Sequence, residues 1–238
     1  MIGNGITFDD KIHTERDWDL KPVSIYIPMP ASKTQIIDIP GGDGSIDLTE
    51  INGRPSYSDR EGIELAFDLR GNDYQTWFMK YSEFAASVHG RKIKMVLDDD
   101  PDHYYMVRLQ LDGKKTNPVY GEIVFSGTAE PFKYDICASN EDWLWDTFNF
   151  ETGVIRELKD LSITEENNTI TITGGGIDTA PVFIVSEADN LQFSYGGRTY
   201  TLKVGRNRFP AVRVGKSDVT LTFSGTGKLS VEYRGRYL

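Results

Sequence analysis

Cysteine is almost absent from this chain of 238 residues, because Cys137 is the only one. A single cysteine excludes intrachain disulfides and any zinc site built from several cysteines. Apolar runs are short, and none approaches the ~18 residues that a membrane-spanning helix requires. The first residues, MIGNGITFDDK, contain no basic stretch followed by an apolar one and so predict no secretory signal. These absences predict a soluble globular protein made in a reducing compartment.

Positive charge is scarce as well: 26 Lys and Arg stand against 36 Asp and Glu, which gives a net charge of −10. Proteins that bind nucleic acid without sequence preference, or bind anionic lipid, need an excess of cations. We therefore expect no specific nucleic-acid binding and no membrane partner. Hydrophobic residues make up 39% of the chain and aromatic residues 12%, which is enough to build a core rather than a disordered chain.

Motifs of catalysis are missing too. His13, His89 and His103 are scattered and form no H-E-x-x-H pattern, and no G-x-S-x-G pentapeptide occurs. The glycine-rich stretch 41–44 lacks the Lys and Ser/Thr of a phosphate-binding loop. A carboxylate pair of the glycosidase kind is defined only in three dimensions, so the sequence does not test it. We expect no catalytic residue, no cofactor and no metal site, and hence no enzyme.

The densest charge run is Asp98-Asp99-Asp100-Pro101-Asp102. Its four carboxylates could ligate Ca²⁺, but the mid-loop glycine and distal glutamate of an EF-hand do not follow. A solvated acidic turn between two strands is the favoured interpretation.

The first half of the chain predicts strands around one helix. Apolar residues recur with helical spacing from Tyr74 to Val88, Asn72 or Asp73 can cap the first turn, and Gly90 fits the end. Strands are predicted on β-branched, aromatic or alternating character at 23–27, 36–39, 62–69, 91–97, 103–111 and 119–127.

The second half predicts strands alone. Short apolar segments separated by glycine turns are typical of a β-sandwich. They lie at 169–173, 182–185, 192–195, 199–202, 219–223 and 229–233. The predicted fold is mainly β with one helix in the N-terminal half (α+β). The predicted division is a domain at 1–138, a connector at 139–153 and an all-β domain at 154–238, with Trp143 and Trp145 packed between the domains.

Three segments in order carry a family resemblance: 39–49, then 97–102 followed by Tyr104-Tyr105, then 129–134. The chain from about 15 to 135 resembles the N-terminal domain of siphophage and prophage distal tail proteins, which are baseplate hub components. One departure is Gly42, where the family often carries Arg. The matching turn residues are Pro40, Gly41, Asp43 and Gly44, and the matching residues of the third segment are Glu130, Pro131 and Tyr134.

The resemblance implies a structural virion protein of the tail tip, made in the host cytoplasm. It implies an N-terminal β-sandwich-like domain with a helix and an extended hairpin that forms a hexameric ring, followed by a galectin-like β-sandwich. The implied partners are the tail tube protein, the tail-tip protein and an accessory or receptor-binding baseplate protein. DNA would pass through the ring without specific binding. Asp98, Asp99 and Asp100 are candidates either for an acidic ring lumen or for a plain solvated turn.

A second hypothesis is a lectin-like module that contacts cell-wall saccharide through the C-terminal domain. Its candidate aromatic platform is Tyr195, Tyr200, Tyr233 and Tyr237, although cross-strand pairs that stabilise a sheet are the favoured interpretation of these tyrosines. A third hypothesis, a tail-associated peptidoglycan hydrolase, is disfavoured by the missing motifs. At 238 residues the chain has no room for an inserted carbohydrate-binding module.

Overall fold

The computed structural model describes residues 5–51, 53–70, 73–117, 119–142 and 154–238. The predicted packing of Trp143 and Trp145 lies outside these residues. The chain divides into two compact units: the first comprises 1–100, 104–133 and Leu238, and the second comprises 101–103 and 134–237. No helix in the described ranges is long and apolar enough to cross a membrane.

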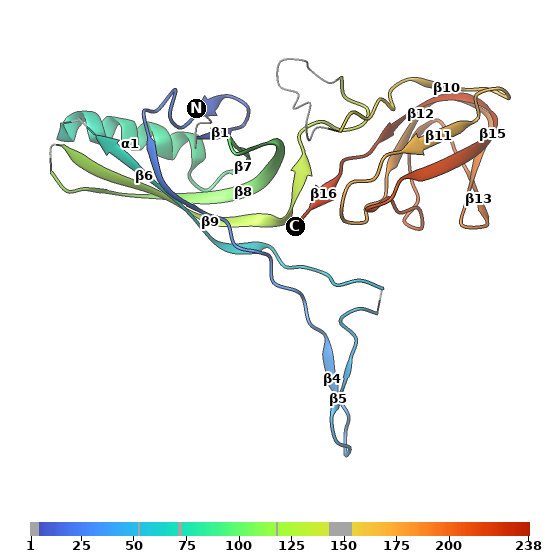
Figure 1. Ribbon diagram of the computed structural model, residues 1–238, viewed down its shortest axis with the longest axis horizontal. Coiled ribbons are helices and arrows are strands. Elements are labelled where there is room, and N and C mark those ends of the chain that lie inside the picture. Colours follow the sequence, from blue (N-terminus) through green and yellow to red (C-terminus); the bar gives the residue numbers. More distant parts are fainter. Residues whose placement is uncertain (1–4, 52, 71–72, 118, 143–153) are drawn as a thin grey trace. The chain divides into compact units, whose positions relative to one another are not determined.

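The first unit is built on a mostly antiparallel sheet (Figure 1). Its strands are β1 (Ile6–Phe8), β2 (Ile12–His13), β3 (Lys21–Tyr26), β6 (Arg60–Arg70), β7 (Lys92–Leu97), β8 (Asp100–Lys115) and β9 (Tyr120–Asp135). They lie in the order β2-β1-β7-β8-β9-β6-β3. β16 (Arg236–Tyr237) also pairs with β9, whose last two residues group with the second unit.

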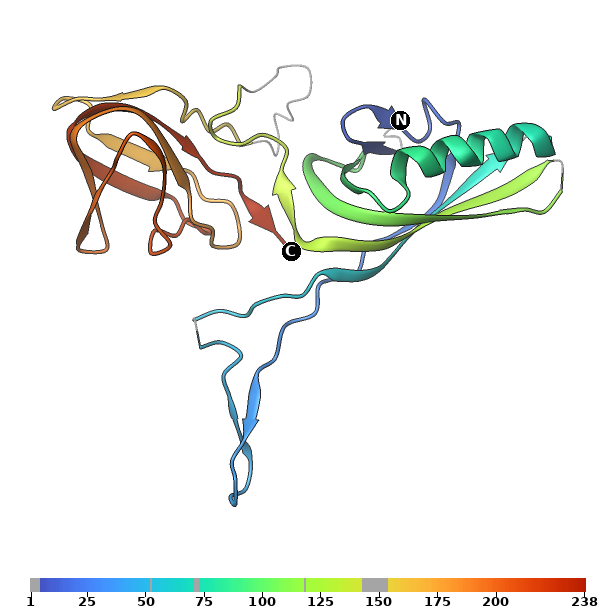
Figure 2. The same cartoon turned by 180° about the vertical axis from the view of Figure 1, so that it is seen from behind.

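The helix α1 (Tyr74–Val88) has the predicted bounds and lies across one face of this sheet in both views (Figures 1 and 2). Asp73 caps it by accepting a hydrogen bond from the backbone N–H of Thr76 at 2.8 Å; the alternative cap, Asn72, lies outside the described residues. The helix ends at Val88 with His89 as its C-cap, and the next residue, Gly90, has a φ of +71° that is unfavourable for other residues. α1 is the sole helix among the described residues, as predicted.

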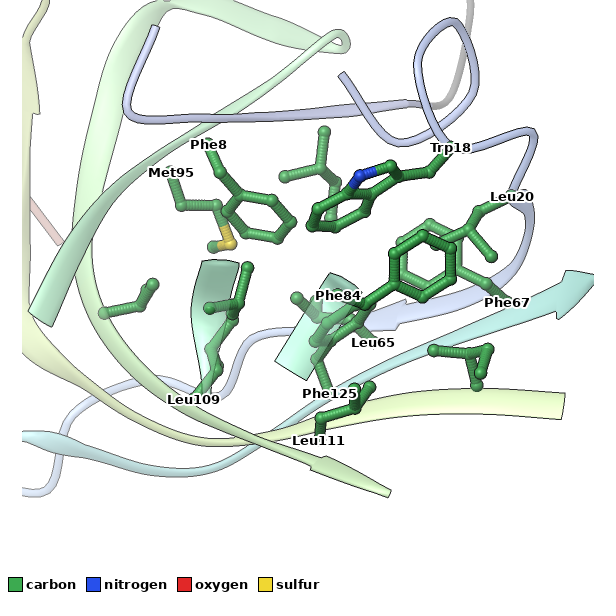
Figure 3. Close-up of a cluster of buried hydrophobic side chains, with 14 of the residues drawn as sticks. Phe8, Trp18, Leu20, Leu65, Phe67, Phe84, Met95, Leu109, Leu111 and Phe125 are labelled. Carbon is green, nitrogen blue, oxygen red and sulfur yellow. The ribbon is translucent and has the colours of Figure 1, made fainter. Parts of the chain in front are cut away.

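The core of the first unit lies between α1, the N-terminal segment and the sheet (Figure 3). Alternate residues of β6 enter it, because successive side chains of a strand point to opposite faces. Trp18 belongs to this core, with its ring centre 4.5 Å from that of Phe84 and its ring stacked on that of Phe125. Aromatic pairs of this kind stabilise a core beyond the area that they bury.

Between β3 and β6 the chain leaves the sheet as an extended hairpin of β4 (Ile36–Asp38) and β5 (Ser45–Asp47). Every residue from 31 to 47 is exposed. Figures 1 and 2 both show this segment, residues 31–51, projecting from the first unit, and we refer to it as the arm.

The second unit is a sheet built around two long strands, β12 (Val182–Tyr195) and β15 (Val219–Glu232). The other strands are β10 (Leu161–Ile163), β11 (Thr169–Ile172), β13 (Arg198–Thr201) and β14 (Gly205–Arg208). The first half of β15 pairs with β11 and its second half pairs with β10. In the same way, the first half of β12 pairs with β14 and its second half pairs with β13. The sheet therefore encloses a single core from two sides, as in a sandwich.

The predicted strands at 182–185 and 192–195 are one strand, and so are those at 219–223 and 229–233. The turn-like residues between them form irregularities in the β12–β15 ladder, between Val185 and Glu187 and between Asp189 and Gln192. Asn190 with φ +49° and Gly225 with φ +77° accommodate this bend. The separate-strand interpretation was wrong at these two places.

Candidate assembly surface

Exposed apolar side chains are concentrated in and just before the arm. Among the described residues, seventeen large hydrophobic side chains are exposed, and eight of them belong to residues 23–51. These eight are Val23, Tyr26, Met29, Ile36, Ile37, Ile39, Ile46 and Ile51. Scattered exposed hydrophobic residues are ordinary, but a run of this kind marks an interaction surface.

The arm has no core of its own. Ile37 and Ile46 face each other across the two strands and remain 48% and 51% exposed, while Ile36 on the opposite face is 58% exposed. A two-stranded hairpin is at best marginally stable in water. Both faces therefore gain stability only if another surface covers them. The sequence signal, three isoleucines within 36–39 instead of an alternating pattern, predicted a strand but not its exposure.

The arm's tip carries the first family-motif turn. Pro40, Gly41, Asp43 and Gly44 are all exposed. Gly41 and Gly44 have φ of +73° and +82°, so the turn needs glycine at both positions. The turn closes through a hydrogen bond from the N–H of Gly42 to the carbonyl of Ile39 at 3.1 Å.

Arg60 links the segment between β3 and the arm to β9. Its side chain is buried, and it donates to the carbonyl of Pro28 at 2.8 Å and to that of Pro131 at 3.1 Å. The guanidinium carbon lies 5.5 Å from the ring centre of Tyr105. Arg60 forms no ion pair with a carboxylate of the described residues, and its Nη2 atom is buried without a hydrogen-bond partner. The two carbonyls and the ring of Tyr105 are the groups that stabilise its charge.

The third segment of the family resemblance lies next to Arg60. Pro131 supplies one of the two carbonyls, and Glu130 forms an ion pair with Lys92 of β7. Tyr134 is half-buried near the end of β9. Glu130 and Pro131 therefore both take part in contacts within the first unit.

The acidic run occupies a shorter turn than predicted. Asp98 and Asp99 form the turn, whereas Asp100 begins β8. Asp98 accepts hydrogen bonds from Gly5 and contacts His13, and Asp100 forms a 2.5 Å ion pair with Lys133. Asp99 is the exposed member. A pore-lining role for the three remains a prediction, and two of the three carboxylates already have cationic or hydrogen-bonding partners.

The histidines have structural contacts. His13 contacts Asp98, His89 accepts a hydrogen bond from the N–H of Leu111, and His103 lies 3.7 Å from Asp135. No group of three or more His, Cys, Asp or Glu within the described ranges is arranged to hold a metal ion.

The tyrosines of the lectin hypothesis do not form an exposed platform. Tyr233 is buried, and Tyr200 stacks on Phe193 with ring centres 5.1 Å apart. Tyr195 is half-buried and donates to the carbonyl of Arg213 at 3.2 Å, and Tyr237 packs edge-on against His103. Contacts within the protein therefore engage all four side chains.

Comparison with known proteins identifies the fold. No family model and no curated protein matches the sequence. Among solved structures, the Dit protein of phage SPP1, a paradigm of the hub adsorption apparatus in phages that infect Gram-positive bacteria, matches with a TM-score of 0.62. The sequences are 11% identical, and the match covers 98% of this chain and 99% of that one.

The baseplate of phage P2 in its activated conformation with Ca matches more weakly, with a TM-score of 0.43, 8% identity and 97% coverage of each chain. That likeness is too low to support an argument. The SPP1 match spans both compact units. Along its whole length, this chain has the fold of the SPP1 Dit protein, which confirms the fold expected from the resemblance to phage distal tail proteins.

Proposed function

We propose that the chain is a structural hub protein of a phage tail, which acts by assembling into a closed ring of identical subunits. The observation that carries this proposal is the exposed apolar arm on a chain with the SPP1 Dit fold. In the proposed assembly, the arm of one subunit covers a different patch on its neighbour, so the contact is heterologous. A heterologous contact repeated around an axis forms a ring when the rotation between neighbouring subunits closes on itself.

The expected ring is a hexamer at the tail tip of the virion, where it joins the tail tube protein to the tail-tip protein. The second unit would dock a receptor-binding or accessory baseplate protein. A net charge of −10 per subunit would repel the phosphate groups of DNA, so the DNA could pass through the ring without binding to it. No catalytic step is part of this proposal. Carbohydrate stacking on exposed tyrosines is not proposed, since the four candidates are engaged in packing.

The test is the mass of the chain in solution, measured by light scattering coupled to size exclusion over a concentration series. We expect a species of six times 26.8 kDa, or a pair of such rings. The variant Ile37→Asp/Ile46→Asp should shift the mass to that of a monomer, because charges would be buried in the subunit contact. Negative-stain images of the large species should show a central hole.

The matched control is Val154→Asp/Ile155→Asp, which places two charges on exposed aliphatic positions outside the arm. This control should assemble as the unchanged chain does. An unchanged chain that stays at 26.8 kDa at the highest concentration would contradict self-assembly. Equal loss of assembly in both variants would contradict the role of the arm.

A further inference from the structure

Two Asp-Gly pairs lie in the described part of the chain, Asp43-Gly44 and Asp112-Gly113. In such a pair the backbone nitrogen of the glycine can attack the side-chain carboxyl carbon of the aspartate, because glycine has no side chain to obstruct the approach. The attack also requires that the peptide plane rotate until the nitrogen faces the carboxyl carbon. The structure gives the two pairs very different freedom to make this rotation.

Asp43-Gly44 lies at the tip of the arm, where both residues are exposed. A side-chain carbon placed on Gly44 would meet no atom within 4 Å, so no other group packs against this side of the turn. Among the described residues, neither the carboxylate of Asp43 nor the N–H of Gly44 has a hydrogen-bond partner. The two reacting groups are therefore both free.

The turn that holds this pair is weakly fixed. Its hydrogen bonds are that from the N–H of Gly42 to the carbonyl of Ile39 at 3.1 Å and a long one from the N–H of Ile39 to the carbonyl of Gly44 at 3.5 Å. The hairpin beneath it is two-stranded, with both faces exposed. Exposed loop tips without tertiary contacts open locally at little cost in free energy. The backbone at the tip can therefore rotate as the attack requires.

Asp112-Gly113 is held in place by the sheet and the helix. Both residues belong to β8, which is hydrogen-bonded to β9. The N–H of Gly113 donates to Oδ1 of Asp112 at 2.8 Å, so it points at an oxygen of the carboxylate and not across the face of its carbon. A side-chain carbon on Gly113 would lie 2.7 Å from the ring of Tyr81, which shows how closely α1 covers this backbone. Rotation here would break the ladder and this packing.

We propose that Asp43-Gly44 is a site of spontaneous covalent modification, at which the aspartate isomerises to isoaspartate. The nitrogen of Gly44 forms a bond to the carboxyl carbon of Asp43, and a carbon–oxygen bond of that carboxyl group breaks. The oxygen leaves as water with the proton of the nitrogen, and a five-membered succinimide remains. Water then opens the ring at either carbonyl: one product is the original aspartate, and in the other the main chain runs through the former side chain.

The reaction needs no reactant other than water, because one water molecule is released and one is consumed. Isoaspartate therefore has the same mass and the same number of carboxylates as aspartate. It adds one methylene group to the main chain of a turn in which Gly41 and Gly44 have positive φ. The arm would thus exist in two covalent forms whose ratio depends on the age of the protein. This inference does not rest on ring assembly, since the reacting groups belong to one chain.

The experiment follows the purified full-length chain over weeks in mildly acidic buffer. Tryptic peptides are then fragmented by electron transfer, which distinguishes isoaspartate from aspartate at each position. We expect isoaspartate to accumulate at Asp43 and to be on the order of tenfold or more scarcer at Asp112, because opening β8 costs free energy that opening the tip does not. The peptide that contains Asp43 also contains Asn52-Gly53. Deamidation there increases the mass and is counted separately.

A denatured sample is the matched control, because unfolding removes the difference in backbone freedom. In denaturant the two pairs should isomerise at similar rates. A difference that persists in denaturant would show that the flanking sequence, and not the fold, sets the rates. Absence of isoaspartate at Asp43, or equal amounts at Asp43 and Asp112 in the folded chain, would also overturn the proposal.

Three variants test the chemistry at the tip. Asp43→Glu should be inert at this position, because its attack would have to form a six-membered ring. Asp43→Asn should react faster than the unchanged chain, since ammonia is then released in place of water, and its mass should increase as the amide becomes a carboxylate. Asp47→Glu, at an exposed acid of β5, should leave the reaction at Asp43 unchanged. A stable Asp43→Asn variant would contradict the proposed freedom of the turn.

Discussion

The ring of His13 lies against the carboxylate of Asp98, with Nε2 3.1 Å from Oδ2, although 85 residues separate the two in sequence. The Nδ1 atom of His13 accepts a hydrogen bond from the N–H of Arg16, so the ring proton is on Nε2 and is donated to Asp98. The same carboxylate accepts the N–H of Gly5 at 3.0 Å. Asp98 thereby ties the N-terminal segment to the turn between β7 and β8.

Replacement of Asp98 should therefore destabilise the fold. Asp98→Ala leaves the N–H of Gly5 and the ring of His13 without their acceptor, and we expect a loss of about 1–3 kcal/mol in the free energy of unfolding. The measurement is the midpoint of denaturant unfolding. Asp99→Ala, in the same turn but exposed, should change the free energy by less than about 0.5 kcal/mol. Equal effects of the two substitutions would refute the anchoring role of Asp98.

Arg60 should stabilise the base of the arm through the planar geometry of its guanidinium group as well as through its charge. Lysine cannot span the carbonyls of Pro28 and Pro131 with one planar group, so Arg60→Lys should lower the free energy of unfolding by about 1–3 kcal/mol. Amide hydrogen exchange should also become faster at the base of the arm. Arg70→Lys, at the exposed end of the same strand, is the matched control and should leave that exchange unchanged. Unchanged exchange in Arg60→Lys would count against this role.

Tyr233 should make stability sensitive to alkaline pH. Burial raises the pKa of its phenol from an ordinary value of 10.0 to about 12. The stabilisation is therefore fully present below pH 10, and it is lost as pH rises through about 12, because the unfolded chain releases this proton first.

The check is thermal unfolding of the unchanged chain and of Tyr233→Phe between neutral pH and pH 12. The buried hydroxyl has no hydrogen-bond partner among the described groups, so Tyr233→Phe should be neutral or stabilising at neutral pH. It should also show a smaller alkaline loss. The same alkaline loss in both proteins would show that other groups are responsible.

Local interactions were sufficient to predict part of this fold. The bounds of α1 follow from apolar residues with helical spacing, a capping aspartate and a glycine after the last turn, all of which act within a few residues. The hairpin turn at 41–44 follows in the same way from glycines at positions that need positive φ. The absence of catalytic motifs was likewise a property of the sequence alone.

The remaining features of the fold depend on contacts between residues that are far apart in the sequence. The four residues of β14, Gly205–Arg208, contain no apolar side chain, and they form a strand because β12 supplies backbone hydrogen-bond partners. The ionic contacts of Asp98 and Asp100 depend on residues 85 and 33 positions away. The exposure of the arm depends equally on which strands pair. The sequence by itself determined the helix, the turns and the charge of each segment, because these depend on neighbouring residues. Only the tertiary structure decided which of those residues share a surface.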